Sequence, residues 1–135
     1  QRADDKYHSG GLWTNTCCSH PRFGEDINFA VKRRLYEEMG LKTNSNFAFS
    51  FVYKAFFANG LTEYEYDNVF IGISDELPVI QSSEVKNWKY MSLPELEKEI
   101  NIHPDEYTQW MQICLPRVKQ YVENLLIKTH SLQTL

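Results

Sequence analysis

The chain has 135 residues, of which 42% are hydrophobic and 14% aromatic, so it carries enough apolar material for the core of one ordinary domain. Fourteen Lys and Arg residues against 18 Asp and Glu residues give a formal net charge of −4, which argues against a general nucleic-acid binder. No apolar run approaches the roughly 18 residues of a membrane-spanning helix. We therefore expect a single soluble domain over residues 1–135, with no membrane partner.

The first residue and the cysteines bear on how the chain is used. It begins with Gln1 rather than Met, and we expect that an upstream segment is missing. Cys17 and Cys18 are neighbours and cannot easily bridge each other, because a disulfide requires separated, facing side chains. With Cys114 the count is odd, which favours a reducing compartment and predicts a cytoplasmic protein.

The first third of the chain predicts a strand, a loop and a helix. Residues 12–18 are rich in strand formers, and residues 19–26 contain the Pro and Gly of a loop. From 25 to 39 apolar residues recur at helical spacing, and Gly40 is a natural terminator.

The middle of the chain predicts a long β-hairpin. Two β-rich runs, 47–57 and 62–73, flank the turn 58–60, whose Asn-Gly pair is the strongest short hairpin signal.

The last third predicts a strand and two helices. Residues 85–91 alternate weakly as a strand, and Ser92 can cap a helix that ends near Ile100. Pro104 opens a third helical run, with a kink expected at Pro116. The order of elements predicts a mixed α/β fold.

Charged and sulfur-containing side chains gather around the first predicted helix. Arg34 and Glu38 share one helix face, with Glu37 beside them, which by itself is typical of a solvated charged face. The loop before the helix adds Cys18 and His20, two residues apart and hence on one side of an extended chain. This combination of a thiol, an imidazole and carboxylates indicates a site that carries out a chemical reaction.

A second pair of this kind follows the hairpin turn. Glu63 and Glu65 point to one face of the predicted strand, and Tyr64 and Tyr66, which alternate with them, point to the other. Carboxylates on one strand face usually sit in water.

The motif WTNTCCSHP, residues 13–21, and the segment after it resemble type I isopentenyl-diphosphate isomerases, a branch of the Nudix superfamily. The Nudix signature can be laid on Ser19, Glu25 and residues 33–41, with two departures: Ser19 replaces the opening glycine and Arg34 replaces a metal-binding glutamate. The isomerase branch shares the arginine, which argues against hydrolysis. The resemblance covers nearly the whole chain and implies a Nudix-type α-β-α sandwich with a mixed sheet, of the α/β (α+β) class.

The resemblance implies four catalytic roles. Cys18 matches the family's catalytic thiol, whereas Cys17 is expected to be a small packed residue. Glu65 matches a carboxylate that touches a metal and transfers a proton, with the hydroxyl of Tyr53 assisting. Trp110 matches an aromatic wall that stabilises a carbocation-like state. We expect cationic surroundings to help Cys18 toward the thiolate, so that it can act as the partner base.

The resemblance also implies how the diphosphate is held. Arg2, Lys6 and Arg34 match the basic residues that bind it, and Glu38 matches the carboxylate that holds Mg²⁺ against it.

A second divalent ion, Mg²⁺, Mn²⁺ or Zn²⁺, is implied at His20, Glu63 and Glu65. In the family two further histidines lie upstream of the position of Gln1, so the site is expected to be incomplete in this chain. Three other histidines do not match the family's ligands, and we expect surface or capping roles for them: His8, His103 and His130.

The implied activity is the interconversion of isopentenyl and dimethylallyl diphosphate, small-molecule precursors of isoprenoids, by a monomer. Two alternatives stay open at this point. One is a Nudix hydrolase of a nucleoside diphosphate derivative, and the other is a non-catalytic domain that keeps the fold.

Overall fold

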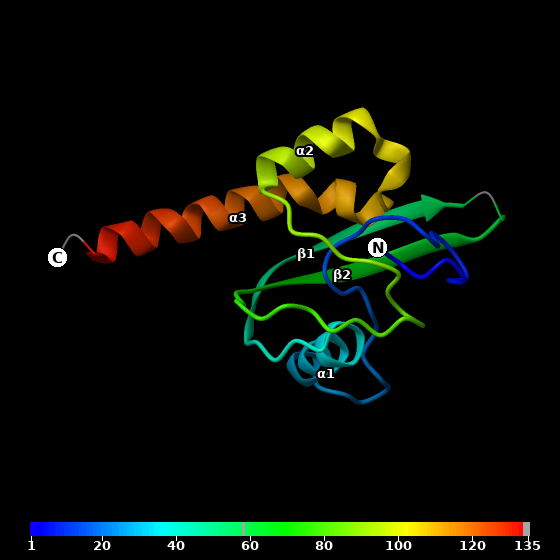
Figure 1. Cartoon of the computed structure of the whole chain (residues 1–135), viewed down its shortest axis with the longest axis horizontal. Helices are drawn as coiled ribbons and strands as arrows, with labels where there is room; N and C mark the ends of the chain where they lie inside the picture. Colours follow the sequence, from blue (N-terminus) through cyan, green and yellow to red (C-terminus); the bar gives the residue numbers. More distant parts are fainter. Residues whose placement is uncertain (58, 134–135) are drawn as a thin grey trace.

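Two long antiparallel strands form the centre of the fold. The computed structural model describes residues 1–57 and 59–133, with side chains of the last helix described as far as Ile127. The elements in chain order are α1 (Ile27–Met39), β1 (Ser45–Phe56), β2 (Thr62–Gly72), α2 (Leu93–Ile102), the 3₁₀ helix η1 (Pro104–Glu106) and α3 (Gln109–Gln133). The hairpin lies between α1 on one side and α2 and α3 on the other (Figure 1), which confirms the α+β class. Among the described residues the sheet consists of β1 and β2 and is antiparallel, so the expectation of a mixed sheet is wrong.

The predicted hairpin is confirmed. β1 and β2 pair antiparallel along nearly their whole length, with one irregularity in register near the start of β1. In the connecting loop the side chain of Asn59 accepts a hydrogen bond from the backbone N–H of Leu61 at 3.2 Å, and Gly60 has φ 80°, a conformation that glycine adopts without strain. Ala58, part of the predicted turn, lies outside the described residues.

The helix predicted over 25–39 is also confirmed, and its ends have local causes. It begins at Ile27 because the side chain of Asp26 accepts hydrogen bonds from the backbone N–H groups two and three residues later, at 2.9 and 3.2 Å. It ends at Gly40, which has φ 68° and donates its N–H to the carbonyl of Tyr36 at 2.9 Å.

The two C-terminal helices follow the prediction with shifted ends. Ser92 and Glu95 form a reciprocal capping box at the start of α2, and His103 ends that helix, so its expected capping role is confirmed. η1 occupies the position where the third helix was predicted to open, and α3 begins only at Gln109. Pro116 lies inside α3. The side chain of His130 is outside the described residues.

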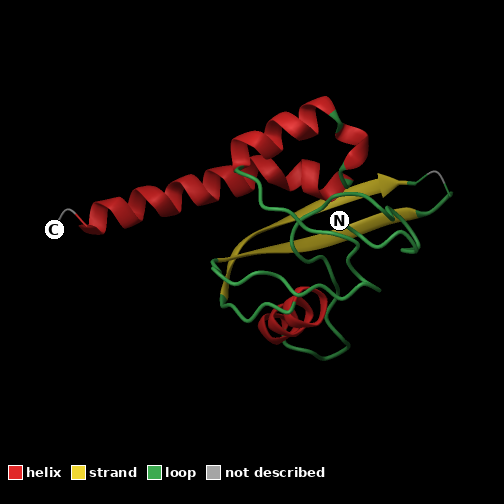
Figure 2. Ribbon diagram, in the orientation of Figure 1, coloured by secondary structure: helices red, strands yellow, loops and turns green. Residues whose placement is uncertain are grey.

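Two predicted strands are wrong. Residues 12–18 contribute a single parallel bridge, from Trp13 to Tyr107, and residues 85–91 contribute a single antiparallel bridge, from Val85 to Arg2. Each segment meets a loop or the end of a short helix, so no ladder of backbone hydrogen bonds can extend from either bridge (Figure 2). The β-branched and aromatic residues of these segments therefore contribute to packing, although the segments do not form strands.

Three small apolar clusters make up the core. One lies between the hairpin and the start of α3: Tyr53, Ala55 and Trp110, with Cys18, Phe51 and Phe57 packed against them. The others are Met39, Leu41 and Val85, and Ile100, Tyr107 and Leu115. The first cluster therefore contains three of the residues to which the resemblance gives catalytic roles. Within the described residues, no helix is long and apolar enough to cross a membrane.

Candidate active site

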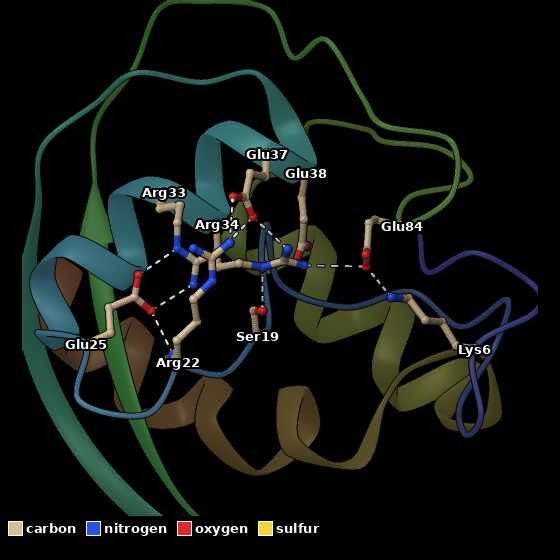
Figure 3. Close-up of polar contacts among 9 residues, drawn as sticks. All are labelled: Lys6, Ser19, Arg22, Glu25, Arg33, Arg34, Glu37, Glu38 and Glu84. Carbon is tan, nitrogen blue, oxygen red and sulfur yellow. Dashed lines mark hydrogen bonds and ion pairs between the residues drawn. The ribbon is translucent and has the colours of Figure 1, made fainter.

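Arg33 fixes the loop that leads into α1. Its guanidinium donates two hydrogen bonds to Glu25, at 2.6 and 2.8 Å, and a third to Glu37 at 2.8 Å (Figure 3). The bidentate pair with Arg33 lowers the pKa of Glu25 to about 2. The signature glutamate and arginine thus hold the loop against the helix.

Arg34 connects the two positions that depart from the Nudix pattern. Its guanidinium donates to the hydroxyl of Ser19 at 2.6 Å, to Glu37 at 2.8 Å and to Glu38 at 2.5 Å (Figure 3). The residue that replaces the opening glycine is therefore hydrogen-bonded to the residue that replaces the glutamate. The arginine occupies this corner with positive charge where a hydrolase pattern would place a carboxylate.

Glu84 connects Lys6 to Arg34. Its carboxylate pairs with the ammonium of Lys6 and lies 3.6 Å from the guanidinium of Arg34 (Figure 3), and these contacts lower its pKa. We call Lys6, Arg34, Glu38 and Glu84 the charged cluster. It brings together three residues that the resemblance assigns to diphosphate and Mg²⁺. Glu84 was not predicted, because no motif surrounds it.

Glu38 is the buried member of the charged cluster, with only 6% of the residue exposed. Burial raises its pKa, and the guanidinium of Arg34 opposes that shift. The thiol of Cys17 hydrogen-bonds to Glu38, and burial raises the thiol pKa as well. The hydrogen bond from the Cys17 thiol lowers the pKa of Glu38, so Cys17, like Arg34, stabilises the ionised carboxylate against the effect of burial.

The inward face of β2 carries a column of carboxylates. Glu63, Glu65 and Asp67, the carboxylate column, alternate with Tyr64 and Tyr66, which are 73% and 67% exposed. The usual arrangement, with aromatic rings inside and carboxylates in water, is reversed. Asp67 was not predicted, although it continues the alternation of the two glutamates and could have been found from it.

Each glutamate of the column has a partner from another segment. The hydroxyl of Tyr53 donates to Glu63, and His20 Nε2 lies 3.0 Å from Glu65 Oε1. Burial and the neighbouring Glu63 raise the pKa of Tyr53. Burial, Glu65 and Glu63 raise the pKa of Asp67 to about 6. These surroundings therefore favour the protonated forms of Tyr53 and Asp67.

Cys18 packs against Tyr53 and Trp110 beside this column. Its pKa is raised to about 12, mainly by burial and then by Asp67, while Arg2 acts in the opposite direction. The expectation that cationic surroundings favour a thiolate is wrong for the ligand-free protein, because desolvation and nearby carboxylates outweigh one guanidinium. Cys18 is a neutral thiol here.

Trp110 is buried at the centre of the apolar cluster, and its indole N–H donates to Asn15 at 3.1 Å. The guanidinium of Arg2 lies 5.2 Å from the centroid of its ring. Arg2 is therefore placed at Trp110, and its guanidinium also donates to the backbone carbonyl of His8 at 3.2 Å.

His8 is not a surface residue, so that expectation is wrong. The residue is 8% exposed, and its Nε2 lies 2.9 Å from Glu63 Oε1. Its ring stacks on Phe57 with centroids 4.6 Å apart. The N-terminal segment folds over the end of the hairpin, which the local sequence does not indicate.

The residues assigned to a second metal ion are divided between two separate pairs, one of which includes His8, a residue without an assigned metal role. His20 faces Glu65 and His8 faces Glu63, and within the described residues no group of three His, Cys, Asp or Glu side chains could hold a metal ion. Their nitrogen and oxygen donors suit Mg²⁺, Mn²⁺ or Zn²⁺, but these side chains do not form a closed site. All three cysteines are free, as expected for the neighbouring pair.

Comparison with known proteins shows the family of the chain. Residues 1–111 match the NUDIX domain family. The chain is 49% identical over 118 residues to isopentenyl-diphosphate Delta-isomerase 2 of Aromatoleum aromaticum, which covers 87% of this chain and 62% of that protein. It is 44% identical over 121 residues to isopentenyl-diphosphate Delta-isomerase of Pectobacterium atrosepticum, covering 90% of this chain and 68% of the relative. The corresponding enzyme of Photobacterium profundum is 49% identical over 130 residues, covering 93% and 69%. The chain thus spans less than two thirds of the first of these relatives.

Proposed function

Because the chain belongs to the NUDIX family and, within it, to the isopentenyl-diphosphate Delta-isomerases, we propose that it interconverts isopentenyl and dimethylallyl diphosphate in the supply of isoprenoid precursors. One observation carries the proposal. Cys18, Tyr53 and Trp110 pack in one apolar cluster beside the carboxylate column. A proton-transfer reaction on a hydrocarbon needs this combination of acids and bases with a dry, aromatic wall.

The proposed reaction adds a proton to one carbon and removes a proton from another, through a carbocation-like state. In the ligand-free protein the Cys18 thiol and the Tyr53 hydroxyl both hold their protons, since the pKa of each is raised. Either can serve as the acid, and a carboxylate of the column, such as Glu65, takes up the proton released from the other carbon. The π face of Trp110 would stabilise the cation by about 2 kcal/mol in a desolvated site.

The diphosphate is proposed to bind at the charged cluster. Lys6 and Arg34 would contact its oxygens, and Glu38 would hold Mg²⁺ against it. Arg2, whose guanidinium lies over the ring of Trp110, would contact the end of the diphosphate nearest the hydrocarbon. The binding energy of the diphosphate then positions the reacting carbons, which carry few polar groups that the protein could bind.

Nudix isomerases generally use a divalent metal. We propose His20, Glu63 and Glu65 as ligands of a second ion, and a bound ion would neutralise part of the negative charge of the column. The described side chains do not form a closed site, so each proton transfer proposed here uses only side chains of the chain. We place this activity in the cytoplasm, in a single chain acting on a small molecule.

The hydrolase alternative is not favoured. Arg34 occupies the position of a metal-binding glutamate and is held there by Ser19 and Glu38. No carboxylate can replace it without breaking both contacts.

Label uptake tests the proposal directly. The chain is incubated with isopentenyl diphosphate and Mg²⁺ in deuterated water, and deuterium in the dimethylallyl product is measured together with released phosphate. The isomerase predicts label without phosphate. Phosphate release would support a hydrolase, and the absence of both would contradict the isomerase.

A further inference from the structure

His8 is a buried, polar side chain to which the proposed reaction gives no role. The side chains of His8 and Glu63 are only 5% and 12% exposed, and 2.9 Å separates Nε2 from Oε1. The other oxygen of Glu63 accepts the hydroxyl of Tyr53. Glu63 is therefore held between an imidazole from the N-terminal segment and a phenol from β1.

The second ring nitrogen of His8 is also occupied. Nδ1 lies 3.1 Å from the hydroxyl oxygen of Ser9. When Nε2–H donates to Glu63, Nδ1 accepts from Ser9, so the neutral ring has a partner on each side. Ser9 itself has φ 52°, an uncommon conformation for a residue other than glycine.

Aromatic neighbours fix the plane of the ring. Phe57 stacks on it at 4.6 Å with an interplanar angle of 20°, and Tyr7 meets it edge-on at 4.4 Å. Trp110 also meets it edge-on, at 5.9 Å. The imidazole cannot turn without disturbing these contacts, so its direction toward Glu63 is set by packing.

We propose that His8 is a positioning residue that orients Glu63 and, through Glu63, the hydroxyl of Tyr53. The inference rests on the proposed isomerase function, in which the hydroxyl of Tyr53 is one of the two groups that can deliver a proton. A carboxylate held only by Tyr53 could rotate, and a reacting group displaced by about 1 Å can lose about 100-fold in rate. Residues that support ligands and reacting groups in this way typically contribute about 10- to 100-fold.

Two substitutions separate the hydrogen bond from the packing. His8→Phe keeps a ring between Phe57 and Trp110 but removes the donor, whereas His8→Gln keeps an N–H donor near the position of Nε2. We expect His8→Phe to lower kcat about 10- to 100-fold with a KM for isopentenyl diphosphate within about threefold of the wild type. His8→Gln should recover most of the loss. Full activity in His8→Phe, or equal losses in both variants, would overturn the role.

An NMR measurement on the wild type tests the contact between His8 and Glu63 and does not depend on enzymatic activity. Long-range ¹H–¹⁵N NMR on metal-free protein reports which nitrogen of His8 carries the proton. We expect one tautomer, with Nε2–H protected from exchange with water, and loss of that protection in Glu63→Ala. A mixture of tautomers, or a signal that Glu63→Ala does not change, would overturn the positioning role even where His8→Phe fails to fold.

The two arms keep the inference separate from the proposed function. Absence of label uptake in the wild type contradicts the isomerase and, with it, the role of His8 in the reaction. Label uptake with an unprotected Nε2–H, or with an active His8→Phe variant, leaves the isomerase intact and rejects His8 alone.

Discussion

The charged cluster and the carboxylate column both collect acidic side chains, but they differ in what surrounds those acids. In the cluster, Glu84 faces Lys6 and Arg34, and its pKa is lowered. In the column, Asp67 faces further carboxylates under partial burial, and its pKa is raised to about 6. Opposite charge stabilises the ionised form of Glu84 in the first region, where Arg34 also opposes the rise that burial causes in the pKa of Glu38. Desolvation with like charge stabilises the protonated form of Asp67 in the second.

This difference separates binding from proton transfer. A region of matched charges is suited to exchange one anion for another, as when a diphosphate approaches Lys6 and Arg34. A region that keeps Cys18 and Tyr53 protonated next to a buried tryptophan is suited to give and take protons from carbon. The two regions adjoin at Cys18, which interacts electrostatically with both Glu38 and Glu65.

The largest effects should come from the proton-transfer region. We expect Cys18→Ala and Glu65→Gln each to lower kcat by about 1,000-fold or more, since positioned acids and bases contribute about 100- to 10,000-fold each. Label uptake from deuterated water measures the loss, and circular dichroism checks the fold. Cys17→Ala is the matched control, because it removes a neighbouring thiol that contacts Glu38 instead. Near-normal rates in Cys18→Ala would contradict its role.

The next effect concerns the aromatic wall. Trp110→Phe keeps an apolar ring but weakens the cation–π interaction and removes the hydrogen bond to Asn15. We expect kcat to fall about tenfold, which corresponds to about 1.4 kcal/mol, with little change in diphosphate binding. Trp88→Phe, in the cluster with Met39, is the control. An unchanged kcat would count against stabilisation of a cation by Trp110.

A smaller effect should come from the charged cluster. Glu84→Gln removes the carboxylate that Lys6 and Arg34 share, so both cations become available to the substrate. We expect KM for isopentenyl diphosphate to fall about threefold at unchanged kcat, and the difference to shrink as salt screens the charges. Glu97→Gln, which breaks the distant pair with Lys119, should leave KM unchanged. A higher KM in Glu84→Gln would mean that the carboxylate organises the cations instead of competing for them.

Features with local causes could be predicted from the sequence. The limits of α1 follow from Asp26 and Gly40, the start of α2 follows from Ser92, and the hairpin follows from Asn59 and Gly60. In each case the determining contact spans a few residues. The segments 12–18 and 85–91 were mispredicted because a strand also needs a partner ladder, which residue type does not supply.

The site divides in the same way. The motif around Cys18 and the signature on α1 could be located from residues alone. His8 and Glu84 could not, because their partners Glu63 and Lys6 are distant in the sequence. The protonation of Cys18 was mispredicted for a related reason, since burial of the thiol outweighs the nearby cation and is decided only by packing.

The smallest expected effect is on stability in acid, and it belongs to the charged side of the comparison. The pKa of Glu25 is about 2 in the folded protein against an ordinary value of 4.5, because Arg33 holds its ionised form. The unfolded chain therefore binds the proton more readily than the folded one. The stability that this pair contributes is fully present above pH 4.5 and is lost as pH falls toward about 2. Measured as Tm against pH, the wild type should lose more between pH 5 and pH 3 than Glu25→Gln, whose side chain does not titrate. Parallel curves for the two proteins would contradict the ion pair. Asp67→Asn is the control: it should not reduce the loss of Tm between pH 5 and pH 3 as Glu25→Gln does, because the pKa of Asp67 is shifted in the opposite direction.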